Sequence, residues 1–584
     1  MAHRKAPGSD PPNVAPVSEA WNKLPWRKFE QHVYRIQKRI YRASQRGKTR
    51  TVQKLQKLLL KSEAARLLAV RRVTQENRGK KAAGVDGVKS VPPKQRLVMA
   101  KQIHPKHWKR RKPRPVRRVW IPKPGKAERR PLGIPTMLER SKQALGKMAL
   151  EPEWEAKFEP NSYGFRPGRS CHDAIEMIFT AINHKPKFVY DADIKGCFDH
   201  IDQEALLQKL HTYPALSQTI KGWLKAGVLE GAVFTPTDRG TPQGGVISPL
   251  LANIALHGME TAVREGFGRS PSIEKPILVR YADDFIILHS KKATVERAAE
   301  KIEVWLNDMG LHLNPEKTRV THTLTAVDGQ VGFDFLGFTI RQFPVGETHT
   351  GTDAHGNPQG FKTLVKPGKE ETKRHMRAIK QRLRKLGHRS QAEIIATLNP
   401  LIRGWADYYK TVVSSAVFAH CDEILYAQLM SWALGKHPSR GKKWILNRYW
   451  HMIGNRQWVY ATPDGKSRVW AHGLTRIQRF MKVRGTASPY DSNLVYWTKR
   501  LKDHPLMASE KAKLLSMQNG LCPRCGLYFR DGDLLETDHA LPTALGGKDD
   551  ISNKWVYHRH CHDEKTSEDM ARIAGRRAAG ITHN

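Results

Sequence analysis

The chain has 584 residues, 39% of them hydrophobic, and its 100 Lys and Arg against 55 Asp and Glu give a formal net charge of +45. This length provides several domains with their own cores, and the positive excess indicates a polyanionic partner, nucleic acid ahead of an anionic membrane surface. The sequence contains no apolar run long enough to span a bilayer and no apolar segment of a secretion signal, so we expect neither a membrane span nor export.

The N-terminal part of the chain reads as a tail followed by basic helices. Residues 1–17 are rich in Pro and Ala, which predicts a disordered tail. Residues 18–76 show helical periodicity, as in VQKLQKLLLKSEAARLLAV, with basic residues on the polar face. From 101 to 130 the chain has thirteen Lys or Arg and one acid, interleaved with aromatic and β-branched residues. We expect a folded basic surface there, although a solvated charge run is the usual explanation.

Two stretches in the middle of the chain place carboxylates next to apolar strands. ILVRYADDFIILH has apolar runs on both sides of Asp283 and Asp284, which predicts a β-hairpin with the Asp pair near its bend. FVYDADIKGCFD begins as a strand on which Asp191 and Asp193 share one face. A surface turn also accounts for an Asp pair. If Asp193 lies beside the hairpin, three carboxylates could instead bind two Mg²⁺ ions for in-line phosphoryl transfer.

The last third of the chain is basic and rich in Trp and Tyr. A Gly-, Thr- and His-rich stretch over 341–365 predicts a linker or surface loop, and the segment 366–455 that follows reads as basic helices. Residues 456–515 are again basic, with three Trp. These segments are candidates for gripping nucleic acid through Lys and Arg, while most of the aromatic side chains are expected in the core.

The C-terminal segment has metal-ligand spacing. CPRC and HRHC provide a C-x₂-C and an H-x₂-C pair, which suits a tetrahedral Zn²⁺ site in a reducing compartment better than disulfides. Cys522, Cys525, His558 and Cys561 form the best set. His560 competes with His558, because both lie within reach of Cys561. A purely structural zinc ribbon is the simplest alternative.

The Y-A-D-D hairpin preceded by D-I-K-G-C-F-D resembles the signature of reverse transcriptases, and most closely that of proteins encoded by bacterial group II introns. Six further blocks occur along the chain in the family's order, four before the hairpin and two after it: NRGKKAAGVDGV, IPKPGKAERRPLGIPT, SYGFRPGRSCHDAI, RGTPQGGVISPLLANI, LNPEKT and FLGF. A single chance match is plausible, but this series is not. One departure is mild: the family's Asp-Arg pair after G-I-P-T is Glu139-Arg140 here.

The resemblance implies a role for individual residues of the polymerase. Asp193, Asp283 and Asp284 match the triad that binds two Mg²⁺, and Phe198 matches an aromatic gate against the 2′-hydroxyl. Gln243 and Gly244 match the block beside the nascent base pair, and Lys123 and Arg130 match positions that neutralise the incoming triphosphate. A core role for Phe198, and general backbone binding by Lys123 and Arg130, remain the alternatives.

The D-H…N…H-C-H pattern at the C-terminus exceeds what a zinc ribbon needs and resembles HNH nucleases of the ββα-metal class. The resemblance implies that His539 is the general base, Asp538 and His562 bind the catalytic divalent cation, and Asn553 orients the loop. In another arrangement His558 joins the catalytic metal and leaves the zinc site one ligand short.

The fold that the resemblance implies is an α+β multidomain chain: a right-hand polymerase with fingers and an antiparallel palm sheet, an α-helical thumb/maturase domain, for which LNPLIRGWADYYK is the opening, and a small zinc-containing ββα-metal HNH domain. The expected domains are a tail (1–17), a helical RNA-binding extension (18–90), fingers and palm (91–345), thumb/maturase (346–455), a basic DNA-binding region (456–515) and the HNH domain (516–584).

The implied function is that of a multifunctional intron protein: an RNA-directed DNA polymerase, a maturase that assists splicing, and an endonuclease that cuts the DNA strand that primes reverse transcription. Expected partners are intron RNA, target DNA and deoxyribonucleoside triphosphates, in a cytoplasmic, nucleoid-associated location. One alternative is a splicing factor without active polymerase, against which the intact Asp triad and HNH motif argue. The other is a defence or diversity-generating reverse transcriptase, against which the maturase-like segment followed by HNH argues.

Overall fold

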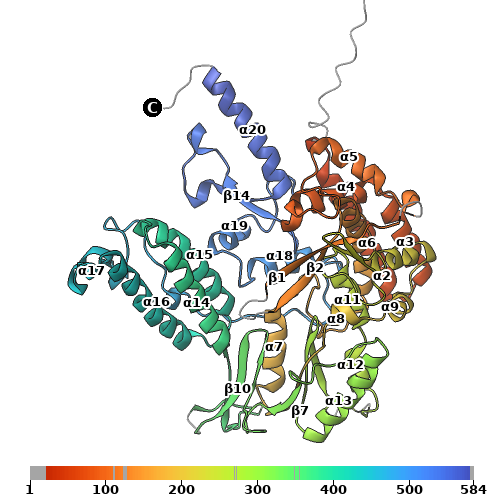
Figure 1. The fold of residues 1–584 in the computed structure, drawn as a ribbon, viewed down its shortest axis with the longest axis horizontal. Helices are drawn as coiled ribbons and strands as arrows, with labels where there is room; N and C mark the ends of the chain where they lie inside the picture. Colours follow the sequence, from red (N-terminus) through yellow and green to blue (C-terminus); the bar gives the residue numbers. More distant parts are fainter. Residues whose placement is uncertain are drawn as a thin grey trace, which may run out of the picture.

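The computed structural model describes residues 21–108, 112–122, 128–268, 270, 273–346, 349–353 and 355–578. The expected tail over 1–17 and the candidate Lys123 lie outside these residues. The described part is a mixed α+β chain in which helical regions flank two four-stranded sheets (Figure 1). None of the helices in this part has the length and apolar character needed to cross a bilayer.

Helices dominate the N-terminal region, as the periodicity of residues 18–76 predicts. Along α2, buried residues recur at the helical spacing of Val33, Ile36 and Ile40, and this face packs on the neighbouring helices. The elements are α2 (Trp26–Gln45), α3 (Thr49–Lys61), α4 (Glu63–Arg71), the π-helical turn η1 (Arg72–Glu76), η2 (Arg78–Lys81), α5 (Pro93–Gln102), η3 (Pro105–His107) and α6 (Met137–Glu155).

The first sheet follows the helices and has the strand order β2-β1-β4-β5. It consists of β1 (Val116–Pro122), β2 (Arg129–Ile134), β4 (Val228–Glu230) and β5 (Val233–Thr235). Strands β1 and β2 form an antiparallel hairpin, and β4 joins β1 in parallel. The basic stretch before 130 therefore belongs in part to a folded sheet.

The second sheet has the order β6-β7-β3-β8 and is antiparallel throughout. Its strands are β3 (Phe188–Asp193), β6 (Ile277–Tyr281), β7 (Asp284–His289) and β8 (Arg319–His322). Helix α13 (Lys292–Asn307) packs with Phe285 and Ile287, while α7 (Cys171–Ile182) packs with Ile286 and Leu288. Because both faces are covered, the strands are apolar without alternation.

Short helices connect these two sheets. They are α8 (Cys197–His200), α9 (Gln203–Leu210), α10 (Pro214–Leu224), α11 (Ser248–Ala255) and α12 (Met259–Arg264). Their buried residues join the same core as α13 and the N-terminal helices. The N-terminal helical region and the second sheet therefore share one hydrophobic core.

The stretch 341–365 is expected to be a linker or surface loop, and the structure corrects this expectation at both ends of the stretch. A third sheet, of order β11-β10-β9, includes β9 (Phe333–Phe335), β10 (Phe338–Pro344) and β11 (Phe361–Pro367), so both ends of the stretch are strands. The register joins Phe338 to Pro367 and Pro344 to Phe361. Alternating buried residues on β10 and β11 supply the core contacts, which the polar composition of the stretch concealed.

A helical bundle follows the third sheet and lies to one side of the molecule (Figure 1, teal). It comprises α14 (Lys369–Lys385), α15 (Gln391–Tyr409), α16 (Ser415–Lys436) and α17 (Lys442–Tyr449), followed by the hairpin β12 (Trp450–Ile453) and β13 (Arg456–Tyr460). Ile379, Leu398 and Leu425 belong to its own core. Tyr409 is buried, and Trp405 and Tyr408 pack partly against the core, as expected for the aromatic residues of this segment.

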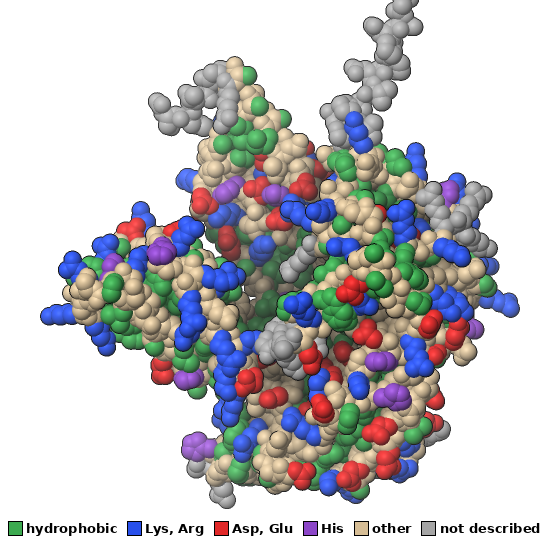
Figure 2. All heavy atoms as spheres, viewed as in Figure 1, with side chains coloured by type: hydrophobic (Ala, Val, Ile, Leu, Met, Phe, Trp, Pro, Cys, Tyr) green, Lys and Arg blue, Asp and Glu red, His purple; other side chains and the backbone are tan. Residues whose placement is uncertain are grey.

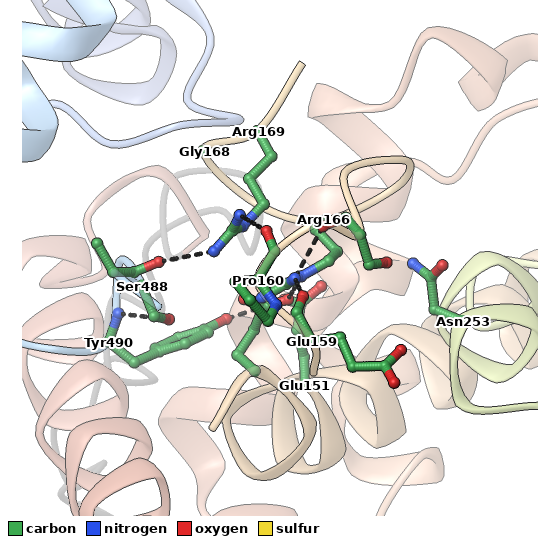
Figure 3. A network of polar contacts seen from close by, with 12 residues as sticks. Glu151, Glu159, Pro160, Arg166, Gly168, Arg169, Asn253, Ser488 and Tyr490 are labelled. Atoms are coloured by element: carbon green, nitrogen blue, oxygen red, sulfur yellow. Dashed lines mark hydrogen bonds and ion pairs between the residues drawn. The ribbon is translucent and has the colours of Figure 1, made fainter. Parts of the chain in front are cut away.

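The chain then crosses back over the second sheet region in a strap, residues 483–500, which includes α18 (Leu494–Lys502) as far as Arg500. Val483, Ser488, Tyr490 and Trp497 are buried. Figure 3 shows Arg169 donating to this strap and Tyr490 directed at Glu151, to whose Oε2 its hydroxyl donates at 2.9 Å. Part of the predicted basic region is therefore a structural crossover.

The C-terminal module packs on the N-terminal helices. It contains α19 (Ser509–Met517), β14 (Leu535–His539), η6 (Thr543–Leu545), η7 (Ile551–Asn553), β15 (Lys554–His558) and α20 (Arg559–Ala578). His560 Nδ1 lies 3.8 Å from Glu30 Oε1, and Arg71 Nη2 lies 2.5 Å from the same oxygen. In the strap, the Pro489 carbonyl accepts a hydrogen bond from Tyr34 Oη. Segments more than 450 residues apart thus meet at α2.

Candidate active sites and metal centre

The Asp283–Asp284 pair lies at a tight turn, which confirms the predicted hairpin. Strand β6 ends at Tyr281 and β7 begins at Asp284, and these two residues are register partners. Ala282 adopts a φ of 58°, the left-handed region that such two-residue turns require. The turn sets the Asp283 and Asp284 carboxyls at the end of the second sheet.

Asp193 joins them from the neighbouring strand. In the antiparallel register of β3 and β7, Asp193 is paired with Asp284. Burial, followed by the charges of Asp283 and Asp193, raises the pKa of Asp284 to about 7, and burial likewise raises the pKa of Asp283. Lys317 Nζ lies 2.5 Å from Asp193 Oδ2 and offsets part of this charge. The structure thus brings the three predicted carboxylates together.

A network that the sequence did not reveal supports the turn. The guanidinium of Arg280 is fully buried and donates to Ala282 O and Asn253 Oδ1, each at 3.0 Å. Asn253 in turn donates to Gly164 O at 2.8 Å. A Cβ on Gly164 would lie 2.3 Å from Ala282 N, so only glycine allows this loop to approach the turn. The one sequence signal for this network is an Arg within an otherwise apolar strand.

A cavity of about 470 Å³ is lined by strands of the first sheet and by residues that follow β3. Asp193 and Asp284 line a separate cavity of about 350 Å³. Phe198 and Gln243 are among the lining residues of the larger cavity, and Gln243 Nε2 donates to Asp199 Oδ2 at 3.4 Å. Phe198 is half-buried and packs edge-on against Phe165, with ring centroids 6.0 Å apart. Gly244, at φ 108°, approaches the backbone of Gly133 so closely that a Cβ would meet its oxygen at 2.7 Å.

Arg130 is an exposed residue of β2, paired with Ile121. Its charge acts on Asp283 and partly opposes the rise in the pKa of that carboxyl. Arg130 is therefore near enough to Asp283 for its charge to act on that carboxyl.

The Cys/His segment forms one compact ligand cluster. Ligand atoms of Cys522, Cys525, His558 and Cys561 all lie within 4.8 Å of one another, and all four residues are buried. His558 Nε2 lies 3.3 Å from Asp533 Oδ2, an outer carboxylate that leaves Nδ1 for the cluster. His560, the competing residue, faces Glu30 instead. The geometry therefore favours His558 in the cluster.

The D-H motif lies at the end of β14, across from α20. Asp538 Oδ2 lies 3.7 Å from His562 Nε2, and His539 Nε2 lies 2.9 Å from Asp549 Oδ1. Asn553 fastens the intervening loop: its Oδ1 accepts from Leu541 N, and its Nδ2 donates to Leu541 O. Asp538 and His562 thus lie together, whereas the His539 ring is paired with Asp549 of the loop between β14 and β15.

Family comparisons match four successive parts of the chain. Residues 21–103 match the N-terminal domain of reverse transcriptase, 121–340 the reverse transcriptase (RNA-dependent DNA polymerase), 372–450 the group II intron maturase-specific domain and 522–568 the HNH endonuclease. Protein YkfC of Escherichia coli K12 is 33% identical over 50% of this chain and 83% of its own length. The group II intron-encoded protein LtrA of Lactococcus lactis is 29% identical over 61% of this chain and 70% of its own length.

The chain belongs to the group II intron-encoded reverse transcriptases. This intron-encoded protein is multifunctional: it carries a reverse transcriptase domain, a maturase-specific domain and an HNH endonuclease domain. Maturase-like protein 1 of Euglena gracilis, 27% identical over 54% of this chain and 64% of its own length, is a further relative. The maturase match favours the intron protein over a defence or diversity-generating reverse transcriptase.

The donor atoms of the intron-encoded protein fit different classes of metal ion. Carboxylate oxygens at the β3–β7 end suit hard divalent cations, which also compensate the mutual repulsion that raises the pKa of Asp284. Three thiols and one imidazole suit a softer ion of tetrahedral preference. Asp538 with His562 offers one oxygen and one nitrogen.

Proposed function

We propose that this group II intron protein copies intron RNA into DNA at Asp193, Asp283 and Asp284, assists splicing of that RNA, and cuts target DNA with its C-terminal module, the three steps of retrohoming. The observation that carries the proposal is the pairing of Asp193 with Asp284, inside the segment that matches reverse transcriptases. Phe198, five residues after Asp193, lines a cavity of about 470 Å³. A cavity of this size suits a nucleotide.

The three carboxylates would hold two Mg²⁺ ions. Bound Mg²⁺ supplies activation of the primer 3′-hydroxyl and stabilisation of the leaving pyrophosphate. The register of β3 and β7 holds Asp193 and Asp284 side by side, and Arg280 fixes the turn that carries Asp283. The chain thus presents preformed oxygen donors, with Lys317 as the partner of Asp193.

The substrate would be a deoxyribonucleoside triphosphate in the cavity. Arg130, with Lys123, would neutralise the triphosphate, for which a bidentate guanidinium and a point-charge ammonium are suited. Phe198 would exclude the 2′-hydroxyl, because an aromatic ring gives that group neither space nor a hydrogen bond. Gln243 and Gly244 would lie along the nascent base pair; the closeness of Gly244 to Gly133 leaves no room there for a side chain.

The C-terminal module would act as the nuclease. His539 would be the general base, held by Asp549, while Asp538 and His562 would hold one divalent cation, Mg²⁺ in the favoured assignment. Asn553 supports this role by fastening the loop through Leu541.

A structural Zn²⁺ at Cys522, Cys525, His558 and Cys561 would stabilise the same module. The segment is too small for a strong core of its own, so a bound ion would contribute folding free energy.

The right-hand arrangement is part of the proposal. The sheet β2-β1-β4-β5 would form the fingers and β6-β7-β3-β8 the palm, within residues 91–345. The bundle α14–α17 would be the thumb of the maturase domain, 346–455, after an RNA-binding extension at 18–90. Residues 456–515 would contact DNA, and 516–584 would be the nuclease. The four matched segments, which follow this order, support the division.

Intron RNA is the favoured partner of the bundle. The exposed face of α14 carries a dense basic series, and Figure 2 shows Lys and Arg along this side of the molecule. The series comprises Lys373, Arg374, Arg377, Lys380, Arg382, Arg384 and Lys385. Phosphate contacts by such residues supply affinity without sequence preference. We place this ribonucleoprotein in the bacterial cytoplasm, in association with the nucleoid when it acts on DNA.

Two reciprocal variants test the proposal. Asp283→Asn should abolish primer extension on RNA with Mg²⁺ while intron splicing persists, because the basic helices are unchanged. His539→Ala should abolish nicking of the strand opposite the insertion while primer extension persists. If the purified parent made no cDNA on a primed RNA template, the splicing factor without polymerase would be the better description. Loss of splicing in a folded Asp283→Asn protein would contradict the separation of sites.

A further inference from the structure

Lys565 is a buried cation held between two acids of the nuclease module. Its Nζ lies 3.2 Å from Asp538 Oδ2 and pairs closely with Asp569, and its side chain is 9% exposed. Buried lysines are uncommon unless paired, and this one bridges α20 to β14.

The helical repeat of α20 builds this arrangement. Cys561, Lys565 and Asp569 follow one another at spacings of four residues and so share a face of the helix. Cys561 belongs to the proposed zinc cluster, so the start of that face is held by the metal site. Lys565 is thereby fixed in position one turn beyond it.

Asp538 is the residue that this lysine reaches. One carboxylate oxygen, Oδ1, accepts a hydrogen bond from His539 N at 2.9 Å. The other, Oδ2, faces Lys565 at 3.2 Å and His562 Nε2 at 3.7 Å. Two ligand atoms on one Mg²⁺ lie roughly 3 Å apart. A slight shortening of the 3.7 Å distance between Asp538 Oδ2 and His562 Nε2 would therefore let both atoms bind the same cation. Both oxygens of Asp538 are therefore oriented by protein groups.

An ordinary helix ion pair does not account for Lys565. Arg559 on the same helix makes the same pattern, with Asp563 four residues on and Glu536 on β14, yet its side chain is 41% exposed. Such solvated pairs contribute little to stability. The Lys565 side chain is shielded from solvent, and one of its partners, Asp538, is a proposed metal ligand. The Arg559 side chain is exposed, and neither of its partners is a proposed metal ligand.

We propose that Lys565, anchored by Asp569, is a positioning residue that fixes the Asp538 carboxylate for the catalytic cation of the nuclease. The inference rests on the proposed function, because it takes Asp538 and His562 as the ligands. Outer partners of metal ligands commonly set metal affinity in this way. Lys565 does so by holding one oxygen of Asp538 toward His562 while His539 N holds the other.

The test is direct binding of Mn²⁺, followed by electron paramagnetic resonance, to the zinc-loaded full chain. Asp193→Asn and Asp283→Asn form the background, so that the polymerase site does not contribute. Lys565→Met should weaken Mn²⁺ binding about tenfold, and Lys565→Arg should restore most of it. Arg559→Met is the matched control and should bind as the parent does. Nicking should require correspondingly more Mn²⁺ in Lys565→Met.

Equal or tighter Mn²⁺ binding by Lys565→Met would overturn the proposal, because Lys565 would then be only a competing counter-ion. Zinc content and circular dichroism report whether the variant is folded. If Lys565→Met loses zinc, the double variant Lys565→Met/Asp569→Asn is used instead, because it removes both charges of the buried pair. Its Mn²⁺ affinity is then compared with that of the parent in the same way. If Asp538→Asn and His562→Ala bind Mn²⁺ like the parent, the proposed nuclease site itself is wrong.

Discussion

Gly168 lies directly against the indole of Trp497, so closely that an added Cβ would stand 2.3 Å from the ring. This contact joins the loop before α7 to the strap, and Gly168 N also donates to Asp531 of the C-terminal module at 2.8 Å. On the same loop, Arg169 donates to the carbonyls of Gly485 and Ala487. One glycine-containing loop therefore contacts both the strap and the C-terminal module.

Gly168→Ala should displace the strap. The residue has a φ of 72°, which an L side chain rarely adopts, and the new methyl would overlap Trp497. Strain and overpacking together should cost about 2–4 kcal/mol. We expect a lower melting temperature and faster proteolysis within 483–500.

Gly231→Ala is the matched control, because Gly231 has a φ of 59° but no atom within 4 Å of its Cβ position. It should show the backbone strain without the collision. If both variants melt alike, the contact with Trp497 contributes nothing.

Phe198→Val should admit ribonucleotides while most DNA synthesis remains. The ring lines the cavity of about 470 Å³, and Val would vacate the space for a 2′-hydroxyl without replacing any of the three carboxylates. Leaving that hydroxyl unsatisfied accounts for roughly 1–3 kcal/mol of the parent's discrimination. Primer extension with ribonucleoside triphosphates alone measures the change. Phe179→Val, the same substitution on α7, is the control; equal exclusion by all three proteins would make Phe198 a core residue.

Cys525→Ser should release zinc and loosen the module from 516 onward. The Cys525 thiol lies 3.3 Å from His558 Nδ1 inside the cluster. Elemental analysis should find about one zinc per parent chain and far less in the variant, with faster proteolysis of the module. Cys421→Ser removes a thiol that is equally buried but lies in the helical bundle. It should keep the zinc, whereas full zinc in Cys525→Ser would refute the assignment.

Acid should weaken the bundle through His375. Burial, and then the charge of His472, lowers the pKa of His375 from 6.5 to about 3; its ring stacks on Trp405, and its Nε2 lies 2.8 Å from His472 Nε2. The unfolded chain binds this proton near pH 6.5 and the folded chain does not, so stability is full above that pH. It is lost as the pH falls toward 3, by at most about 1.4 kcal/mol per unit.

His375→Gln should therefore lose less melting temperature between pH 7 and pH 5 than the parent does. His388→Gln, which changes an exposed histidine nearby, should behave like the parent. An unchanged pH dependence in His375→Gln would show that protonation elsewhere dominates the acid response.

The sequence is most informative where local pattern and chemistry coincide. The apolar run on both sides of Asp283 predicts the hairpin, because a strand covered on both faces needs no polar alternation. The Cys522 and Cys525 pair predicts a metal cluster from spacing alone. Both features depend on residues close together in the chain.

Distant contacts that no motif signals were not predicted, in contrast to the meeting of Asp193 with Asp284, which the resemblance to reverse transcriptases implied. Arg280 can donate hydrogen bonds to Asn253 and Ser162 only after three segments have packed together. No local sequence pattern predicts these contacts. The strap composition suggests solvent-exposed charge, yet Tyr490 is buried by α2 and α6, far earlier in the chain. His558 and His560 both have an acceptable spacing to Cys561 for a metal ligand. Only the backbone direction at the end of β15 decides which of the two rings faces the cluster.

The meeting of α2 with the C-terminal module also orders events during synthesis. Glu30 and Tyr34 emerge from the ribosome roughly 25–100 s before Pro489 and His560, at translation rates of about 5–20 residues per second. Throughout that interval the face of α2 that carries Glu30 and Tyr34 lacks its C-terminal partners, although the helices around α2 can already pack. The nascent chain therefore passes through a long-lived stage with the polymerase region assembled and the nuclease absent. Chaperones that shield such faces would act on this stage.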